Sequence, residues 1–500
     1  CYRGCRFCDR IVFHLDRAKA DRRIFQATDY GTIVTDTAKN KVPFFRKLTY
    51  SLPAFSLAVV GIPVYVYLPK FYTDVVGIDI VGLGYILLTV RVFDALTDPA
   101  IGYISDRTHT RYGRRRPYIA LGAVCVALTM IFLFNPPAAS PAFEMVWFTV
   151  FIYALFLFWT LVVVPYESLG PEITFDYNDR TSLFAMRDGF LIAGTLAAAS
   201  SPALIQWLFS LSNDASGERV KFFWISVLYA PLIVATCWWC VLTIKELPQR
   251  KKETHVNLLK GLRQVTRNRP FLILLVAYTI SAVGNNLPAT LILYYVQYVL
   301  QSDLADLFLL IYFASGILFL PGWIQVSRRT GKKFAWLASM AINTGAFIGV
   351  FFLGPGDVFI YGILVFISGI GFGATLAIPS AIQADVIDYD ELMSGERREG
   401  QYIGLWSIAK KMAAAVGVGI GLSVLGLAGY TPNVEQSEQV RLTLRTLYAL
   451  VPSVCNIIAF GIALSYPISS RIHRDIRTAI SLRRNGQSVQ NPLEPSQVLA

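Results

Sequence analysis

Twelve apolar stretches of membrane-spanning length constrain the fold of this 500-residue chain more than any other feature. A helix of about 20 apolar residues crosses the hydrocarbon core of a bilayer, and it satisfies its own backbone hydrogen bonds there. The sequence therefore predicts an all-α membrane protein with twelve transmembrane helices. The stretches lie near residues 48–70, 80–104, 117–137, 143–165, 183–209, 222–244, 271–299, 305–326, 334–353, 358–382, 401–428 and 445–467.

Composition agrees with a membrane protein. Hydrophobic residues make up 54% of the chain and charged residues 16%, whereas about 25% of the residues of a typical soluble domain are charged. The formal net charge of +12 falls mostly in short loops between apolar stretches. Membrane topology explains such a pattern, so we expect no nucleic-acid partner.

A polar, basic stretch divides the apolar windows into two sets of six. We predict an N-terminal segment (1–45), a first six-helix half (46–245), a linker (246–269), a second half (270–468) and a tail (469–500). Lys and Arg gather in the loops 105–116, 245–269 and 327–333 and in the tail, whereas the alternate loops YTDVVGID, NPPAASPAFE, QSDLAD and LGPGD have none. The positive-inside rule then predicts a multi-pass plasma (bacterial inner) membrane protein with both termini in the cytoplasm.

A basic motif recurs between the second and third window of each half. The first copy is GYISDRTHTRYGRRR from Gly102, and the second is GWIQVSRRTGKK from Gly322. Two related six-helix halves with a site between them describe the major facilitator architecture, whose loop motif the first copy resembles. Asp106 is predicted to cap or pair with a neighbouring helix end, as part of a gate. The arginines of this motif either share that role or only signal topology; they include Arg107, Arg114 and Arg115.

Acidic residues gather again before the eleventh window. In a predicted cytoplasmic loop, four carboxylates face the arginines Arg397 and Arg398; they are Asp385, Asp388, Asp390 and Glu391. Carboxylates that face arginines favour salt bridges over metal binding. We predict an inner gate here.

Three charges interrupt the second apolar window. Arg91, Asp94 and Asp98 share one face of a helix, and a charge at the bilayer centre costs about 2.5–3.5 kcal/mol. That face must line a cavity or the bundle interior. Two carboxylates one turn apart repel, and carboxylate oxygens suit a hard cation. The two carboxylates therefore predict a coupling site for Na⁺ or H⁺, in which Asp94 and Asp98 would bind Na⁺ if the protein is sodium-coupled. The alternative is a static charge cluster that Arg91 neutralises.

Two lysines in the eleventh window offer a counter-charge. Lys410 and Lys411 are consecutive, so they point about 100° apart and at most one faces the cavity squarely. An intramembrane lysine beside the carboxylates can compete with the cation. The alternative is a side chain that snorkels to the interface, which suits Lys410 better than Lys411.

Three sequence blocks resemble the glycoside–pentoside–hexuronide:cation symporter family, the group that contains the melibiose carrier. They are RVFDALTDPAIGYISDRT…GRRRPY, VPYESLGPEITFDYNDRTSLFAMRDG and ADVIDYDELMSGERREGQYIGLWSIAKKM, with KLTYSLPAF…FYTDVVG before them. The resemblance covers roughly residues 44–470. It implies a cation site at Asp94, Asp98 and Thr160, the eleventh-span lysine at Lys411, and a sugar-contacting arginine at Arg187.

The chain departs from that family where the melibiose carrier binds its sugar. Ala58 and Val163 stand where the carrier has aspartates, and Glu167 stands near the position of a ring-stacking Trp. Without those carboxylates, cation coupling carries over better than galactoside specificity. Glu167 is either a substrate ligand, a proton site or an interfacial helix-end carboxylate, and Trp406 is a candidate for lining the cavity.

We therefore predict cation-coupled symport of a sugar or glycoside by alternating access. The expected partners are a small sugar-like substrate and the lipid bilayer, the protein is expected to be a monomer, and no cofactor is expected besides the coupling ion. The chain has no P-loop motif, so a gradient must drive transport. Two alternatives are a lipid-like or other amphipathic solute and a membrane sensor that transports nothing.

The first residues carry one further pattern. Cys1, Cys5 and Cys8 have the C-x3-C-x2-C spacing with which radical-SAM enzymes hold an iron–sulfur cluster. Such enzymes need a following (β/α) barrel, whereas membrane windows follow here. We expect residues 1–33 to be upstream sequence or a mis-called start.

Overall fold

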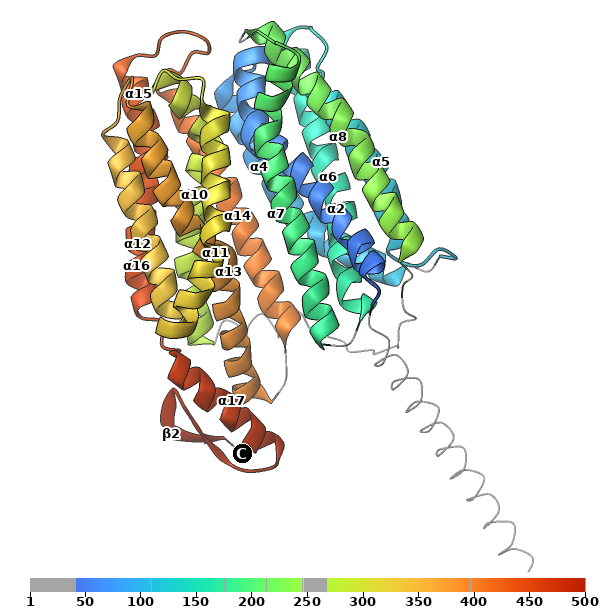
Figure 1. The fold of residues 1–500 in the computed structure, drawn as a ribbon, viewed down its shortest axis with the longest axis vertical. Helices are drawn as coiled ribbons and strands as arrows, with labels where there is room; N and C mark the ends of the chain where they lie inside the picture. The colour runs from blue at the N-terminus through green and yellow to red at the C-terminus, as the bar shows by residue number, and fades with distance from the viewer. Residues whose placement is uncertain are drawn as a thin grey trace, which may run out of the picture.

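The computed structural model describes residues 42–108, 110–174, 177–212, 214–244, 246, 268–395 and 398–499. Nearly all of this is helix (Figure 1). The first half contains α2 (Phe44–Ile62), the π-helical turn η1 (Pro63–Tyr67), α3 (Leu68–Lys70), the π-helical turn η2 (Phe71–Val76), α4 (Ile80–Arg107), α5 (Arg116–Phe134), α6 (Pro141–Ile173), α7 (Tyr177–Leu208) and α8 (Ala215–Thr243). The second half contains α10 (Arg269–Tyr298), α11 (Ala305–Thr330), α12 (Lys332–Phe351), α13 (Val358–Ser394), α14 (Glu399–Leu427), α15 (Glu438–Arg445), the π-helical turn η3 (Thr446–Leu450) and α16 (Val451–Leu464).

The twelve predicted spans are confirmed. Twelve helices in the described part of the chain are long and apolar enough to cross a membrane, and the elements from α2 to η2 together form the first of them. α6 and α13 reach 33 and 37 residues. Since about 20 residues cross the hydrocarbon core, these helices continue past it and carry charged residues beyond the apolar windows.

The helices form two bundles that lie side by side, one coloured blue to green and one yellow to red (Figure 1). In the first bundle α2 packs against α7 and α8, and α5 packs against α6 and α8. In the second, α13 packs against α11 and α12, and α10 packs against α16. α4 packs against α14, and this contact joins the two bundles.

Glycines let α4 and α14 approach closely. A Cβ on Gly419 would lie 2.7 Å from the Cβ of Leu88, and one on Gly426 would lie 2.5 Å from Val81 Cγ2. On the facing helix, a Cβ on Gly84 would lie 3.2 Å from the carbonyl oxygen of Gly419. Small residues at a helix crossing are a common means of close packing inside membranes. Along this crossing, from the start of α4 to the charged residues described below, α14 is held close against α4.

The tail after residue 469 departs from the all-α prediction. α17 (Ser470–Arg484) is followed by a two-stranded antiparallel hairpin of β1 (Val489–Asn491) and β2 (Glu494–Leu499). Asn491 is fully buried and donates to the hydroxyl of Tyr389 at the end of α13. A sequence window tuned to apolar spans does not detect so short a hairpin. The tail lies at the end of the molecule that we call the α17 end, and we call the other end the opposite end (Figure 1).

Candidate functional site

Four side chains meet where α4, α6 and α14 come together. The ammonium group of Lys411 lies 2.9 Å from Asp94 Oδ2 and 2.5 Å from Asp98 Oδ2. Thr160 Oγ1 lies within hydrogen-bonding distance of both carboxylates, at 3.0 Å from Asp94 Oδ1 and 3.1 Å from Asp98 Oδ1. The structure thus brings together the four residues predicted to couple a cation. It also brings Lys411, from the second half, into contact with two carboxylates on α4 of the first half.

The charges in this cluster do not cancel. Two carboxylates and one ammonium leave a formal charge of −1. Asp94 is almost fully buried, whereas a quarter of the side-chain surface of Asp98 and of Lys411 is exposed. The oxygen donors are two carboxylates and a hydroxyl, which is the ligand chemistry of a hard cation. Within the described residues, no group of three or more His, Cys, Asp or Glu could hold a metal ion, so this cluster can offer only two carboxylates.

Arg91 does not neutralise the carboxylates. Its guanidinium lies 4.1 Å from the ring centroid of Tyr65 and 4.7 Å from that of Phe156, and both contacts are cation–π interactions. The alternative of a static Arg91 cluster therefore does not describe this geometry. Helical spacing correctly put Arg91 on the same side of α4, but its long side chain turns toward aromatic rings of α6 and η1.

A cavity of about 340 Å³ in the first half is lined by two of the predicted substrate residues. Arg187 and Glu167 line it, together with Ala58 and Val163, the two positions where family carboxylates are missing. Arg187 pairs with its neighbour Asp188 at 2.7 Å. Among the described residues, the charged groups of this cavity are thus one arginine and one glutamate in a mostly apolar wall.

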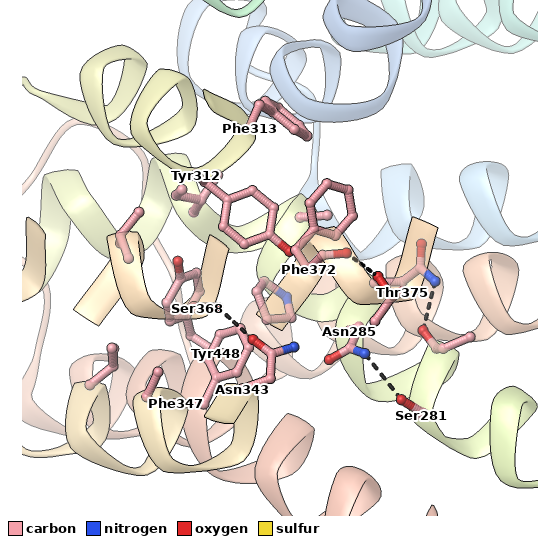
Figure 2. A pocket seen from close by; sticks show the side chains of 18 of the residues that line it. Ser281, Asn285, Tyr312, Phe313, Asn343, Phe347, Ser368, Phe372, Thr375 and Tyr448 are labelled. Atoms are coloured by element: carbon pink, nitrogen blue, oxygen red, sulfur yellow. Dashed lines mark hydrogen bonds between the residues drawn. The ribbon is translucent and has the colours of Figure 1, made fainter. Parts of the chain in front are cut away.

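A second cavity, of about 330 Å³, lies in the second half (Figure 2). Tyr278 lines it, and the ring of Trp406 stacks on Tyr278 with 4.1 Å between centroids. Trp406 is itself buried. Of these two rings, that of Tyr278 faces the cavity and that of Trp406 lies behind it. Lys410, for which the sequence left open a side chain that snorkels to the interface, lines the cavity as well.

The predicted gate residues of the first half form an ion-pair network at the α17 end. Arg115 binds Asp106 at 2.7 Å, and both Arg114 and Arg115 bind Glu172 on α6. Arg107 stacks on the ring of Tyr103. Asp106 therefore pairs with the start of α5, as predicted for a neighbouring helix end.

Glu246 completes this network, and sequence reasoning missed it. Its carboxylate accepts the backbone N–H groups of Arg114, Arg115 and Arg116, each at 2.9 Å. These groups begin α5, where unpaired N–H groups and the helix dipole favour an acidic partner. Gly113 lies beside it with φ +111°, and a Cβ there would come within 2.6 Å of the Glu246 carboxylate. The glycine before the arginines is thus required by Glu246, which lies far away in the sequence.

The acidic residues near the end of α13 form ion pairs at the α17 end, one of them with an arginine of the predicted inner gate. Asp385 accepts from Lys332 at 2.6 Å, and His473 of α17 lies 3.0 Å from Asp388. Arg398 binds Asp390. Arg397 lies outside the described residues, as do Cys1, Cys5 and Cys8. In the part of the chain that the structure describes, each ion pair at this end stays within one half.

The opposite end differs, because a buried carboxylate there joins the two halves. Asp74 of η2 accepts from Tyr298 at 2.8 Å and from Tyr430 at 2.6 Å, both in the second half. Lys70 binds it at 2.8 Å, and Asn433 donates to its backbone carbonyl. Burial and the neighbouring Asp74 raise the pKa of Tyr430, so this phenol stays a hydrogen-bond donor. Asp74 stands in the sequence block FYTDVVG, but only its partners from the other half reveal its role.

Two six-helix bundles, with buried charges where they meet and a closure at one end, define a membrane transporter of the major facilitator type. A family described as MFS/sugar transport protein matches residues 49–470. The chain belongs to this family, and within it to the glycoside–pentoside–hexuronide:cation symporters, which confirms the resemblance seen in the sequence.

Individual relatives agree with this assignment. The chain is 28% identical over 427 residues to the glucuronide carrier protein homolog of Escherichia coli, covering 84% of this chain and 92% of the relative. It is 30% identical over 407 residues to a putative sulfoquinovose importer of Salmonella typhimurium, covering 79% and 83%. The fold is similar to that of the nucleoside transporter NupG, with a TM-score of 0.61 at 12% identity over 84% of this chain and 99% of that one.

Proposed function

We propose that this protein couples the transport of a sugar or glycoside to a cation gradient, with Asp94, Asp98 and Thr160 as the cation site. One observation carries the proposal: Lys411, from the other half, bridges both carboxylates within 3 Å. The remaining formal charge of −1 favours one monovalent cation. Na⁺ or H⁺ at the carboxylates releases Lys411, and occupancy of the site thereby changes a contact between the halves.

The same contact links cation and substrate. Glu167 and Arg187 line the cavity next to this cluster, and Glu167 lies within electrostatic range of Lys411 and Asp98. When Lys411 leaves the carboxylates, its ammonium becomes available to a substrate hydroxyl. Cation binding therefore raises substrate affinity, and by linkage substrate raises cation affinity by the same factor.

We propose further that the opposite end is extracellular and the α17 end cytoplasmic. Basic loops at the α17 end support this orientation. The closure at Asp74 then corresponds to an inward-facing state, in which the outer side is shut. Both termini would lie in the cytoplasm, in a plasma membrane.

Uptake by proteoliposomes tests the proposal. Vesicles containing the protein receive an inward Na⁺ gradient, an inward proton gradient or neither, with a panel of radiolabelled sugars and glycosides. One of the two gradients is expected to drive accumulation. Asp94→Asn is expected to abolish the gradient dependence while facilitated exchange of substrate remains. The reference variant is Asp79→Asn, an exposed helix-capping aspartate of α4 that binds Gly82 N. Gradient-driven uptake that survives Asp94→Asn with Asp98→Asn would overturn the coupling site.

A further inference from the structure

The tail covers the last turns of α13 at the α17 end. α13 has 37 residues, so its end extends past the hydrocarbon core. α17 packs against α13, and the hairpin of β1 and β2 follows (Figure 1). Side chains of α17, of the hairpin and of α13 are buried together in one apolar cluster; they include Ile476, Ala479, Val489, Leu499, Tyr389 and Leu392. We call residues 470–499 the strap, because both the helix and the hairpin contact α13.

Two arginines at the end of α17 attach the strap to α13. Arg484 binds the buried carboxylate of Glu391, and Arg483 donates to the backbone carbonyl of Leu392. Arginine stays charged throughout the physiological pH range. It therefore gives these two contacts no pH sensitivity of its own.

A third contact can respond to pH. Nε2 of His473 lies 3.0 Å from Asp388 Oδ2 and 3.2 Å from Asp385 Oδ1, so one imidazole spans two carboxylates of α13. His473 is the only histidine in the part of the chain that the structure describes. A neutral imidazole donates one hydrogen bond, whereas a protonated ring carries a charge that attracts both carboxylates. Protonation of His473 therefore tightens the attachment of α17 to α13.

Four elements contribute charged or titratable groups around this contact. Asp385 and Asp388 of α13 attract a protonated imidazole, and Lys332 of α12, which binds Asp385 at 2.6 Å, offsets part of that attraction. Burial raises the pKa of Tyr466, which follows α16 and lies within electrostatic range of Asp385, so this phenol stays neutral. The other basic residues near His473 on α17 are exposed, and solvent and salt screen their charges; they are Arg471, Arg474 and Arg477.

We infer that the strap opposes closing of the α17 end and that protonation of His473 strengthens this opposition. The carboxylates that the strap occupies lie at the same end as Arg107, Arg114 and Arg115 of the first half. While the strap holds these carboxylates, they are withdrawn from pairing with those arginines as the two halves approach. Loss of the proton from His473 loosens the strap, and the α17 end then closes more often. This control of the transport cycle goes beyond the proposed function, and it requires neither a particular substrate nor a particular coupling ion.

Spin labels test the inference without substrate or gradient, on the protein in detergent with its native cysteines replaced by alanine. Ser481→Cys with Thr330→Cys reports the position of the strap, and Tyr112→Cys with Thr330→Cys reports the separation of the halves; all three residues are exposed. Pulsed electron paramagnetic resonance compares about pH 6 with about pH 8, on either side of the pH near 6.5 at which an unperturbed histidine changes charge. Toward the higher pH, the fraction with a released strap and the fraction closed at the α17 end are each expected to rise about tenfold.

Variants at His473 assign this response. His473→Gln cannot carry the charge and is expected to show the distance distributions of the higher pH at both pH values, whereas His473→Arg always carries it and is expected to show those of the lower pH. Arg471→Gln removes an exposed charge from the same helix and is expected to keep the wild-type response. A pH response that persists in His473→Gln would assign the sensor to another group and overturn the inference. A strap that is released with no change at the α17 end, or a wild-type strap whose position does not depend on pH, overturns it as well.

Discussion

Thr160 is the neutral member of the charged cluster, and its hydroxyl lies next to both carboxylates. A hydroxyl can donate to only one of them at a time, and its lone pairs remain available to a cation. In the proposed cation site it would therefore help to set the spacing between Asp94 and Asp98 as well as provide a ligand. Because valine has nearly the same shape as threonine but no hydroxyl, replacing Thr160 by valine tests this role directly.

Thr160→Val is expected to lower the apparent affinity for the coupling cation about tenfold with little change in maximal rate. A hydrogen bond to a charged group contributes about 1.5–3 kcal/mol, and 1.4 kcal/mol corresponds to a factor of ten. The measurement is uptake as a function of cation concentration. Thr149→Val is the control, because Thr149 lies on the same helix and donates to the carbonyl of Met145. Equal effects of both substitutions would argue against a ligand role.

Gly113 shows how one residue can depend on a partner distant in sequence. Gly113→Ala is expected to lower the free energy of unfolding by about 1–3 kcal/mol, since alanine opposes a positive φ and its Cβ would meet Glu246. Thermal unfolding in detergent measures the change. Gly345→Ala is the control: Gly345 is helical and no atom lies within 4 Å of the position its Cβ would take, so alanine is expected to be neutral or slightly stabilising there. A melting temperature of Gly113→Ala equal to wild type would contradict the account of the α5 cap.

Among the elements that join the halves, η2 and α14 carry the buried charged groups, while α7 packs against α11 and η1 against α10. η2 ends the first span with a π-helical turn that carries Asp74, and Gly77 in the left-handed conformation ends it. Its buried carboxylate binds α10 and the segment after α14. Because the acceptor is ionised, each of these bonds is stronger than a neutral one. η2 is thus the element whose separation from α10 must accompany opening of the opposite end.

Asp74→Asn is expected to increase the population open at the opposite end about tenfold. The amide keeps the shape, but it replaces an ionised acceptor with a neutral one, which weakens the bonds from Tyr298 and Tyr430 and removes the ion pair with Lys70. Spin labels on cysteines at Ser216 and Gln301, one in each half, report the separation by pulsed electron paramagnetic resonance. Asp79→Asn lies at the same end without joining the halves, and its distance distribution is expected to match wild type. A distribution unchanged by Asp74→Asn would exclude Asp74 from the closure.

The sequence predicts an element well where local composition determines its structure, and poorly where a partner distant in the sequence determines its contacts. Apolar length alone located the twelve spans, because the bilayer imposes one length on all of them. The meeting of Asp94, Asp98 and Lys411 also followed, since a buried carboxylate pair demands a counter-charge. Glu246 and the partners of Asp74 did not follow. Their bonds span more than a hundred residues, and nothing in a local pattern encodes which helix ends come together.

At the scale of the whole molecule, the protein is two bundles joined by the close crossing of α4 and α14, by a smaller contact between α7 and α11, and by the hydrogen bonds of Asp74. The crossing of α4 and α14 begins near the opposite end and continues to the charged cluster. Movement of one bundle against the other must therefore separate α4 from α14 at the opposite end. A covalent link placed there should stop transport without disturbing either bundle.

A disulfide between Gly84→Cys and Leu422→Cys is expected to abolish uptake on oxidation and to release it on reduction. A Cβ on Gly84 would lie 3.2 Å from the Cβ of Leu422, slightly closer than the Cβ separation of ordinary disulfides and within reach of a small adjustment. The native cysteines are replaced by alanine in the test protein. Each single cysteine variant, treated with the same oxidant, controls for packing changes. Undiminished uptake by the fully cross-linked protein would show that the crossing does not open during transport.

The bridge made by Lys411 has a consequence for how such a transporter responds to its surroundings. A tethered ammonium keeps the same effective concentration beside its carboxylates however dilute the medium becomes. In the proposed mechanism, a free cation replaces the lysine only when its concentration, relative to its dissociation constant, outweighs that fixed competition, so a steep gradient made of very low concentrations leaves the carrier idle. The protein would then measure the absolute abundance of its coupling ion as well as the difference across the membrane, and shortening Lys411 would reset that threshold downward.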